Sequence, residues 1–241
     1  IEQQVVAATL RGSFFSTWAG PVSTAFGVEY REQSVVTTAD PISAVQGFVG
    51  GGTVPYSGEV DVKEGFVEVL VPLARDRAWA ESLSVDLAAR VTDYSTSGRV
   101  ETWKAGFNWS ITPSVRLRAT RSRDIRAPSL EELFAAGSTS QLSVDDTTFV
   151  PGTTRPQGNY LVTAANAGNP LLTPEIADTL TAGIVLTPQA LPELNVSIDY
   201  YDIVLNDAII SLTPATIVRR CLDGSTPELC QFIVRDPNLQ A

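Results

Sequence analysis

Apolar and polar residues alternate with a period of two along most of this chain, and helical periodicity is nearly absent. The clearest segment is Glu101–Ile111, where Trp103, Phe107 and Trp109 fall on one face of a strand and Asn108 falls on the other. The pattern predicts an all-β, antiparallel protein. Eight segments carry it: Val5–Ser16, Val22–Gln33, Glu59–Leu73, Leu83–Thr92, Glu101–Ile111, Val115–Thr120, Thr179–Leu186 and Leu194–Tyr200.

The connections between these segments alternate between short and long. Short links fall at Trp18–Pro21, Ala74–Ala80, Thr112–Ser114 and Pro188–Glu193. Long links fall at Val35–Ser57, Arg123–Ile176 and Asp207–Ala241, and only Tyr94–Arg99 is short where a long link is due. Short periplasmic turns and long extracellular loops are typical of a transmembrane β-barrel.

The composition leaves two all-β classes open. Hydrophobic residues make up 44% of the chain and charged residues 18%, against about 25% charged residues in ordinary globular proteins. No apolar run approaches the roughly 18 residues of a membrane helix. A soluble β-sandwich that binds carbohydrate alternates in the same way, but its outer face normally carries Lys and Glu. Here the polar faces carry Thr, Ser, Asn, Gly and Arg, which favours a wet, enclosed lumen.

Charge and residue types exclude several functions. The net charge of −10 argues against a nucleic acid partner. The chain contains no histidine, so Ser-His-Asp and Cys-His catalysis and histidine metal sites are excluded. Glu64 and Glu68 are four residues apart on one strand face, about 13 Å, which is too far for a glycosidase pair. The sequence therefore predicts no enzyme, no metal site and no cofactor.

The two cysteines, Cys221 and Cys230, lie nine residues apart in CLDGSTPELC. No second pair accompanies them, which argues against zinc. A local disulfide in an oxidising compartment and two free thiols are the remaining interpretations, and the disulfide is favoured. The chain begins at Ile1 and contains no methionine, which indicates a cut or processed N-terminus.

Six segments resemble, in order, the barrel of TonB-dependent outer-membrane receptors. They are GVEYREQ (Gly27–Gln33), VKEGFVEVLVPL (Val62–Leu73), RATRSRDIRAPSLEELF (Arg118–Phe134), NPLLTPE (Asn169–Glu175), VSIDYYDIVLNDAI (Val196–Ile209) and RRCLDGSTPELCQFIVRD (Arg219–Asp236). The last segment is similar to the cysteine-bearing loop of the larger receptors. Ile125 departs from the pattern, because the family usually has Phe before Arg-Ala-Pro.

The resemblance implies that residues 1–241 are about eight strands of a larger barrel, without the plug domain or the C-terminal strands. Such transporters have about 22 strands around a plugged lumen. The implied function is energised uptake of a siderophore, cobalamin or oligosaccharide across the bacterial outer membrane. The implied partners are outer-membrane lipid, the small nutrient ligand and the TonB complex, which acts through the plug. A porin without a plug is the alternative within the same fold.

Ligand-binding candidates come from one basic stretch and one loop tyrosine. Arg116, Arg118 and Arg126 are placed to bind an anionic ligand through charge-assisted hydrogen bonds. The competing interpretation is that these arginines pair with carboxylates of the barrel or the plug. Tyr160, in the longest link, is a candidate for stacking on a sugar or an aromatic siderophore. Cys221 and Cys230 are predicted to form a disulfide in the last extracellular loop.

Overall fold

The computed structural model describes residues 1–45, 47, 54–146, 158–191 and 193–234. They divide into two compact units, one of residues 1–35, 57–133 and 169–209, and a second of the remaining segments. Among the described residues, no helix is long and apolar enough to cross a bilayer.

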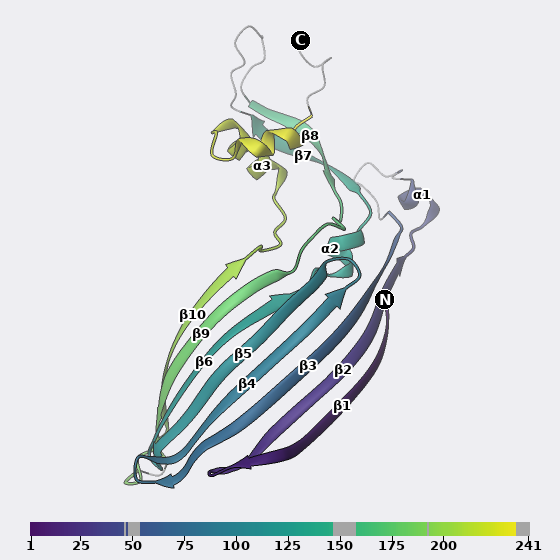
Figure 1. The fold of residues 1–241 in the computed structure, drawn as a ribbon. Helices are drawn as coiled ribbons and strands as arrows, with labels where there is room; N and C mark the ends of the chain where they lie inside the picture. Colours follow the sequence, from purple (N-terminus) through teal and green to yellow (C-terminus); the bar gives the residue numbers. More distant parts are fainter. Residues whose placement is uncertain (46, 48–53, 147–157, 192, 235–241) are drawn as a thin grey trace. The chain divides into compact units, whose positions relative to one another are not determined.

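The first unit contains one antiparallel, curved sheet of eight strands (Figure 1). Its strands follow the order β1-β2-β3-β4-β5-β6-β9-β10, so each strand pairs with its neighbour in the chain except where β7 and β8 intervene. The strands are β1 (Glu2–Thr17), β2 (Gly20–Thr37), β3 (Tyr56–Arg77), β4 (Ala80–Tyr94), β5 (Gly98–Thr112), β6 (Val115–Arg126), β9 (Glu175–Leu186) and β10 (Val196–Asn206).

The prediction of eight strands in an open antiparallel sheet is confirmed, but most strands are longer than expected. β3 runs to 22 residues, whereas the sequence pattern indicated only Glu59–Leu73. The alternation fades toward the strand ends, where both faces become polar, while the backbone pairing continues. The turns after β1, β3 and β5 and the link after β9 lie at one end of the sheet. The long connections after β2 and β6 leave from the other end, where the short turn between β4 and β5 is the exception.

Two adjacent cross-strand rows define the two faces of the sheet. On the face here called the apolar face, successive strands place side by side Leu83, Trp109, Leu117, Ile184 and Ile198. The next row points to the opposite, polar face and consists of Ser84, Asn108, Arg118, Gly183 and Asp199. As predicted, Phe107 therefore lies on the apolar face and Asn108 on the polar face.

The apolar face leaves large side chains uncovered within this chain. Phe26 is 42% exposed, Leu10 54%, Tyr200 62% and Ile198 64%. Soluble monomers rarely expose contiguous apolar surfaces of this kind. The sheet therefore presents a face that needs an apolar environment.

Three tryptophans gather at the end of the sheet that carries the short turns. The indole Nε1 of Trp18 donates to the carbonyl oxygen of Leu73 at 2.7 Å. Trp109 donates to the carbonyl oxygen of Trp79 at 3.2 Å, and their rings meet edge to face at 6.4 Å. Trp103 is not part of this group, because β5 begins at Gly98 and places Trp103 well inside the strand.

The long link after β6 contains regular structure that the sequence pattern did not predict. It contains helix α2 (Leu130–Phe134) and a separate antiparallel hairpin of β7 (Ser138–Asp146) and β8 (Gly158–Asn166). The hairpin belongs to the second unit, as do α1 (Pro41–Ala44), α3 (Pro214–Leu222) and the 3-10 helix Pro227–Phe232. Within that unit, α3 packs against the 3-10 helix and β7.

Candidate functional site

The polar face of β2, β3 and β4 carries a chain of ion pairs centred on Glu64. Its carboxylate accepts from Arg31 at 3.0 Å and from Arg90 at 2.9 Å, and only 7% of its side chain is exposed. The Arg90 guanidinium also lies 5.3 Å from the ring centroid of Phe66, within the range of a cation–π contact. Glu64 thus pairs with arginines on both adjacent strands.

Arg118 and Asp199 form a second cross-strand pair. Arg118 lies opposite Gly183 on β9, which in turn lies opposite Asp199 on β10. The Arg118 Nη2 donates to both carboxylate oxygens of Asp199 at 2.8 Å. A Cβ at Gly183 would overlap the Asp199 carboxylate, so this arginine reaches the aspartate across a strand only because glycine lies between them.

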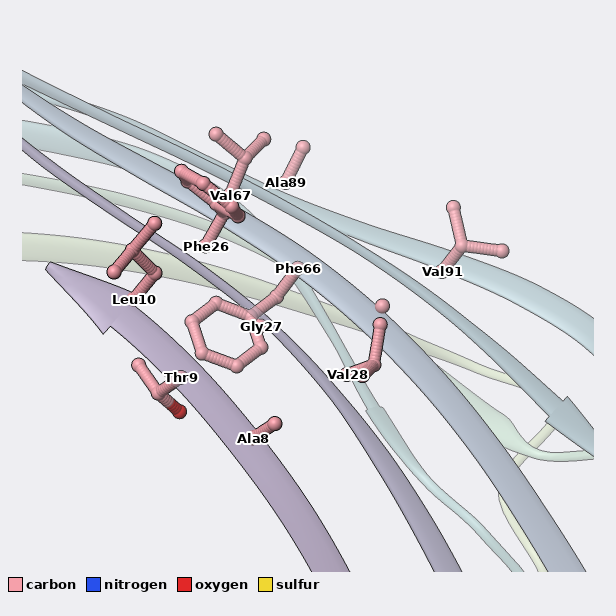
Figure 2. A pocket seen from close by; sticks show the side chains of 11 residues that line it. Ala8, Thr9, Leu10, Phe26, Gly27, Val28, Phe66, Val67, Ala89 and Val91 are labelled. Carbon is pink, nitrogen blue, oxygen red and sulfur yellow. The ribbon is translucent and has the colours of Figure 1, made fainter.

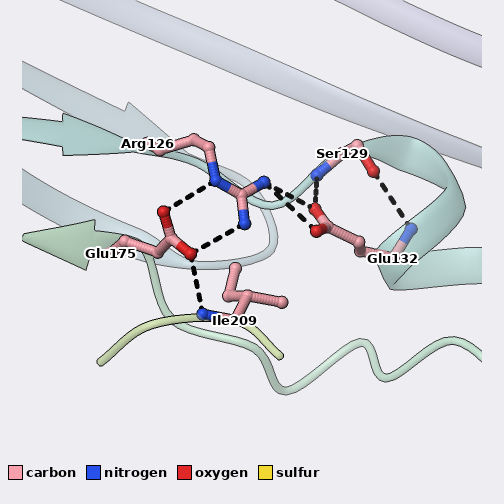
Figure 3. Close-up of polar contacts among 5 residues, drawn as sticks. All are labelled: Arg126, Ser129, Glu132, Glu175 and Ile209. Atoms are coloured by element: carbon pink, nitrogen blue, oxygen red, sulfur yellow. Dashed lines mark hydrogen bonds and ion pairs between the residues drawn. The ribbon is translucent and has the colours of Figure 1, made fainter. Parts of the chain in front are cut away.

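Arg126 is the centre of a third arrangement at the end of β6 from which the long connections leave (Figure 3). Its guanidinium donates to both carboxylate oxygens of Glu175, at 2.7 and 2.9 Å, and to those of Glu132, at 3.0 and 3.1 Å. The backbone N–H of Ile209 donates to Glu175 at 2.7 Å. The group formed by Arg126, Ser129, Glu132, Glu175 and Ile209, here called the Arg126 cluster, joins the ends of three strands.

Helix α2 supplies one half of this cluster through a capping box. The backbone N–H of Ser129 donates to the Glu132 carboxylate at 2.7 Å, and the N–H of Glu132 donates back to the Ser129 hydroxyl at 3.2 Å. The Arg126 guanidinium and the backbone N–H of Ser129 lower the pKa of Glu132 below its ordinary value. Ser-x-x-Glu directly after Arg-Ala-Pro is a sequence signal that would have identified Ser129 and Glu132.

The predicted ligand-binding arginines thus lie in different surroundings. Arg118 and Arg126 are engaged by carboxylates of this chain, whereas Arg116 is exposed and makes no ion pair among the described residues. Arg123 points to the apolar face and pairs with Asp178 at 2.9 Å. Tyr160 belongs to β8, opposite Val144, but its side chain lies outside the described part of the chain. Ligand binding by Arg116, Arg118, Arg126 and Tyr160 stays a prediction.

The polar face also contains a hollow of about 600 Å³ across β1 to β5. It is lined by groups of both charges, with Arg11 and Lys104 beside Glu68 and Asp86. Lys104 lies 3.2 Å from one carboxylate oxygen of Asp86, and the other oxygen is buried with no hydrogen-bond partner in the described part of the chain. This mixed lining suits a polar partner rather than an apolar one.

A cluster of three carboxylates lies at the border of the apolar face. Single carboxylate oxygens of Glu32, Glu59 and Asp61 lie within 4.8 Å of one another, and the Tyr30 hydroxyl donates to Asp61 at 2.7 Å. This cluster could not be predicted from the sequence, because Glu32 of β2 approaches the two carboxylates of β3 only across the strand pair.

The predicted disulfide is present in the second unit. Cys221, in α3, and Cys230, in the 3-10 helix, are joined by an S–S bond of 2.06 Å, with Cα atoms 5.0 Å apart. The bond ties together two short helices with few buried side chains of their own. Their packing therefore depends on a covalent link as well as on apolar contacts.

An open antiparallel sheet with one apolar and one polar face, short turns at one end and long connections at the other, is the wall of a membrane-type β-barrel. The sequence matches a family model described as TonB dependent receptor-like, beta-barrel, over residues 3–222. The chain belongs to this family, whose members are outer-membrane β-barrel transporters. None of the curated protein sequences matches the chain.

Solved structures with the same fold include the ferric enterobactin receptor PfeA from Pseudomonas aeruginosa in complex with enterobactin. A mutant of that receptor is 16% identical, with a TM-score of 0.60 over 83% of this chain and 26% of that chain. The siderophore receptor PirA from Acinetobacter baumannii is 16% identical, with a TM-score of 0.53 and the same coverage. PirA from Pseudomonas aeruginosa is 14% identical, with a TM-score of 0.54 over 83% of this chain and 31% of that chain. The chain thus spans about a quarter to a third of these receptors.

Proposed function

We propose that this chain forms part of the wall of a receptor that imports a ferric siderophore across the bacterial outer membrane in an energised step. The family match over residues 3–222 carries the proposal. The siderophore is favoured over cobalamin or an oligosaccharide because the ferric enterobactin receptor PfeA and the siderophore receptor PirA share the fold.

In this proposal the two faces of the sheet have different partners. The apolar face contacts outer-membrane lipid, because its exposed aromatic and aliphatic side chains can be placed in hydrocarbon at little cost in free energy. The polar face lines the lumen and contacts the plug, through which the TonB complex acts. The hollow between Arg11, Glu68, Asp86 and Lys104 offers charges of both signs to a plug side chain or to a passing ligand.

The ion pairs of the wall limit which residues can recognise an anionic siderophore. Arg118 and Arg126 donate to carboxylates of this chain, so binding through them requires the ligand to compete with those pairs. Arg116 has no such competitor among the described residues, but it lies at the start of β6, at the end of the sheet that carries the short turns. Arg118 and Arg126 would then serve the ligand indirectly, by holding adjacent strands in register.

Uptake by cells that express the full-length receptor tests the proposal. Ferric enterobactin labelled with radioactive iron serves as the probe, and a strain lacking the receptor gene serves as the control. Energised uptake should disappear in the deletion strain and after addition of a protonophore. Uptake that continues with the protonophore would favour the plug-less porin. A deletion strain that keeps iron uptake but loses cyanocobalamin or maltodextrin uptake would identify a different cargo.

A further inference from the structure

A shallow groove crosses the apolar face over strands β1 to β4 (Figure 2). It has a volume of about 610 Å³, within the range of small-molecule sites. Figure 2 shows Leu10, Phe26, Val67 and Val91 rising from the sheet around it. The lining is Ala8, Thr9, Leu10, Phe26, Gly27, Val28, Gly65, Phe66, Val67, Ala89 and Val91.

The groove is open because the residue at the centre of β3 is Gly65, although neither its backbone conformation nor a neighbouring atom requires a glycine there. A Cβ built on Gly65 would meet no atom within 4 Å, and its backbone φ is not in the left-handed region. Four glycines elsewhere in the sheet, Gly12, Gly27, Gly106 and Gly183, do have a neighbour within that distance. Glycine inside a strand is destabilising, and it often marks a place where another group approaches closely.

The chemistry of the groove restricts its occupant. The side chains that point into it are aliphatic or aromatic, so an occupant with polar groups would lose its hydrogen bonds to water without replacing them. The groove continues the apolar face on which Phe26 and Leu10 are exposed. Toward the long-connection end, the same face becomes polar, with the exposed Lys63 and the Tyr30–Asp61 hydrogen bond. The site therefore has an apolar channel with a polar border at one end.

We propose that this groove seats one acyl chain of a membrane lipid, with the lipid head group toward Tyr30, Asp61 and Lys63. The assignment rests on the proposed position of the apolar face in the outer membrane. An acyl chain is unbranched, has no polar atoms and leads to a polar head, which matches the channel and its border. Gly65 keeps the floor low enough for the chain to lie against the sheet, between Val28 and Val67.

Native mass spectrometry of the folded, full-length receptor in detergent tests the site, with dimyristoyl phosphatidylethanolamine as the titrated probe. The wild type should retain one lipid at low lipid concentration. Gly65→Leu should weaken this binding roughly fifteenfold, because losing contact with two methylene groups costs a factor of about four each. The matched control is Ala105→Leu, which adds a similar side chain on the apolar face outside the groove and should keep the lipid.

Several outcomes would overturn the proposal. These are a wild type that retains no lipid, a Gly65→Leu variant that binds as the wild type does, and a control that loses binding equally. A dimer of the receptor that Gly65→Leu dissociates would assign the groove to a second copy instead. Folding of each variant is checked by its heat-modifiable mobility on SDS gels. Iron uptake is scored separately: its absence in the wild type would count against the proposed cargo, and the lipid result would still stand.

Discussion

Alanine in place of Gly27 and alanine in place of Gly65 should change the stability of the barrel in opposite directions. The two glycines lie in adjacent strands, and both have ordinary backbone φ values. A Cβ on Gly27 would lie 2.7 Å from the carbonyl oxygen of Ala8 and 2.8 Å from Cε1 of Phe66. A Cβ on Gly65 would meet no atom. The same methyl group therefore clashes at one site and fits at the other.

The magnitudes follow from these surroundings. At Gly27 one clashing atom belongs to the backbone, which cannot rotate away, and overpacking of this kind costs about 1–3 kcal/mol. At Gly65 the substitution mainly reduces the conformational entropy of the unfolded chain, which stabilises by about 0.4–1 kcal/mol. The free energies of unfolding of the two variants should thus differ by roughly 1.4–4 kcal/mol.

Urea unfolding of the full-length receptor in detergent, followed by tryptophan fluorescence, measures this difference. Unchanged m-values would show that the same surface unfolds in all variants. Gly27→Ala should lower the midpoint, and Gly65→Ala should raise it. If both variants lose stability equally, the glycines matter through strand propensity alone, and the account of Phe66 covering Gly27 is refuted.

Three further results are expected. Phe107→Arg should impair barrel assembly far more than Asn108→Arg, because arginine near the midplane of the lipid face costs about 2–4 kcal/mol. Heat-modifiable gel mobility measures assembly. Equal tolerance of the two substitutions, or the reverse order, would contradict the assignment of Phe107 to the lipid face. Serine in place of Cys221 and Cys230 should destabilise their loop by about 2–3 kcal/mol, seen as faster limited proteolysis there and not in the sheet. The lowered pKa of Glu132 means that its contribution to stability is present above the ordinary glutamate pKa and lost as pH falls through the lowered value. Amide-exchange protection of α2 should therefore fall in acid, and Glu132→Gln should remove that pH dependence.

The strands could be predicted from the sequence because each carries its own period-two signal. The face assignment of Glu101–Ile111 is confirmed for the same reason, since alternation needs no information about neighbouring strands. The hairpin formed by β7 and β8 was missed because β7 has only two apolar residues, Leu142 and Val144, and the apolar residues of β8 do not alternate with polar ones. The extended strand ends were missed because pairing with a neighbour, rather than alternation, continues them beyond the apolar band.

The candidate site depended on strand register, which a single sequence does not contain. Arg118, Gly183 and Asp199 are separated widely in the chain, yet the register places them in one row. The basic stretch was therefore visible as a set of charges, but its partners were not. The Arg126 cluster could be predicted only in part. Glu132 is near Arg126 in the sequence, whereas Glu175 lies 49 residues away from it.

Glycine positions connect the two faces of this sheet in one physical argument. On the polar face, Gly183 leaves room for the Asp199 carboxylate, and Gly106 leaves room for that of Asp86, so each acid can lie flat over the neighbouring strand. Arg118 and Lys104 then neutralise these acids along the wall. On the apolar face, the same kind of space over Gly65 is left open. On the polar face a side chain of this chain fills the space over each glycine. On the apolar face, in the placement proposed above, the surrounding membrane would fill it.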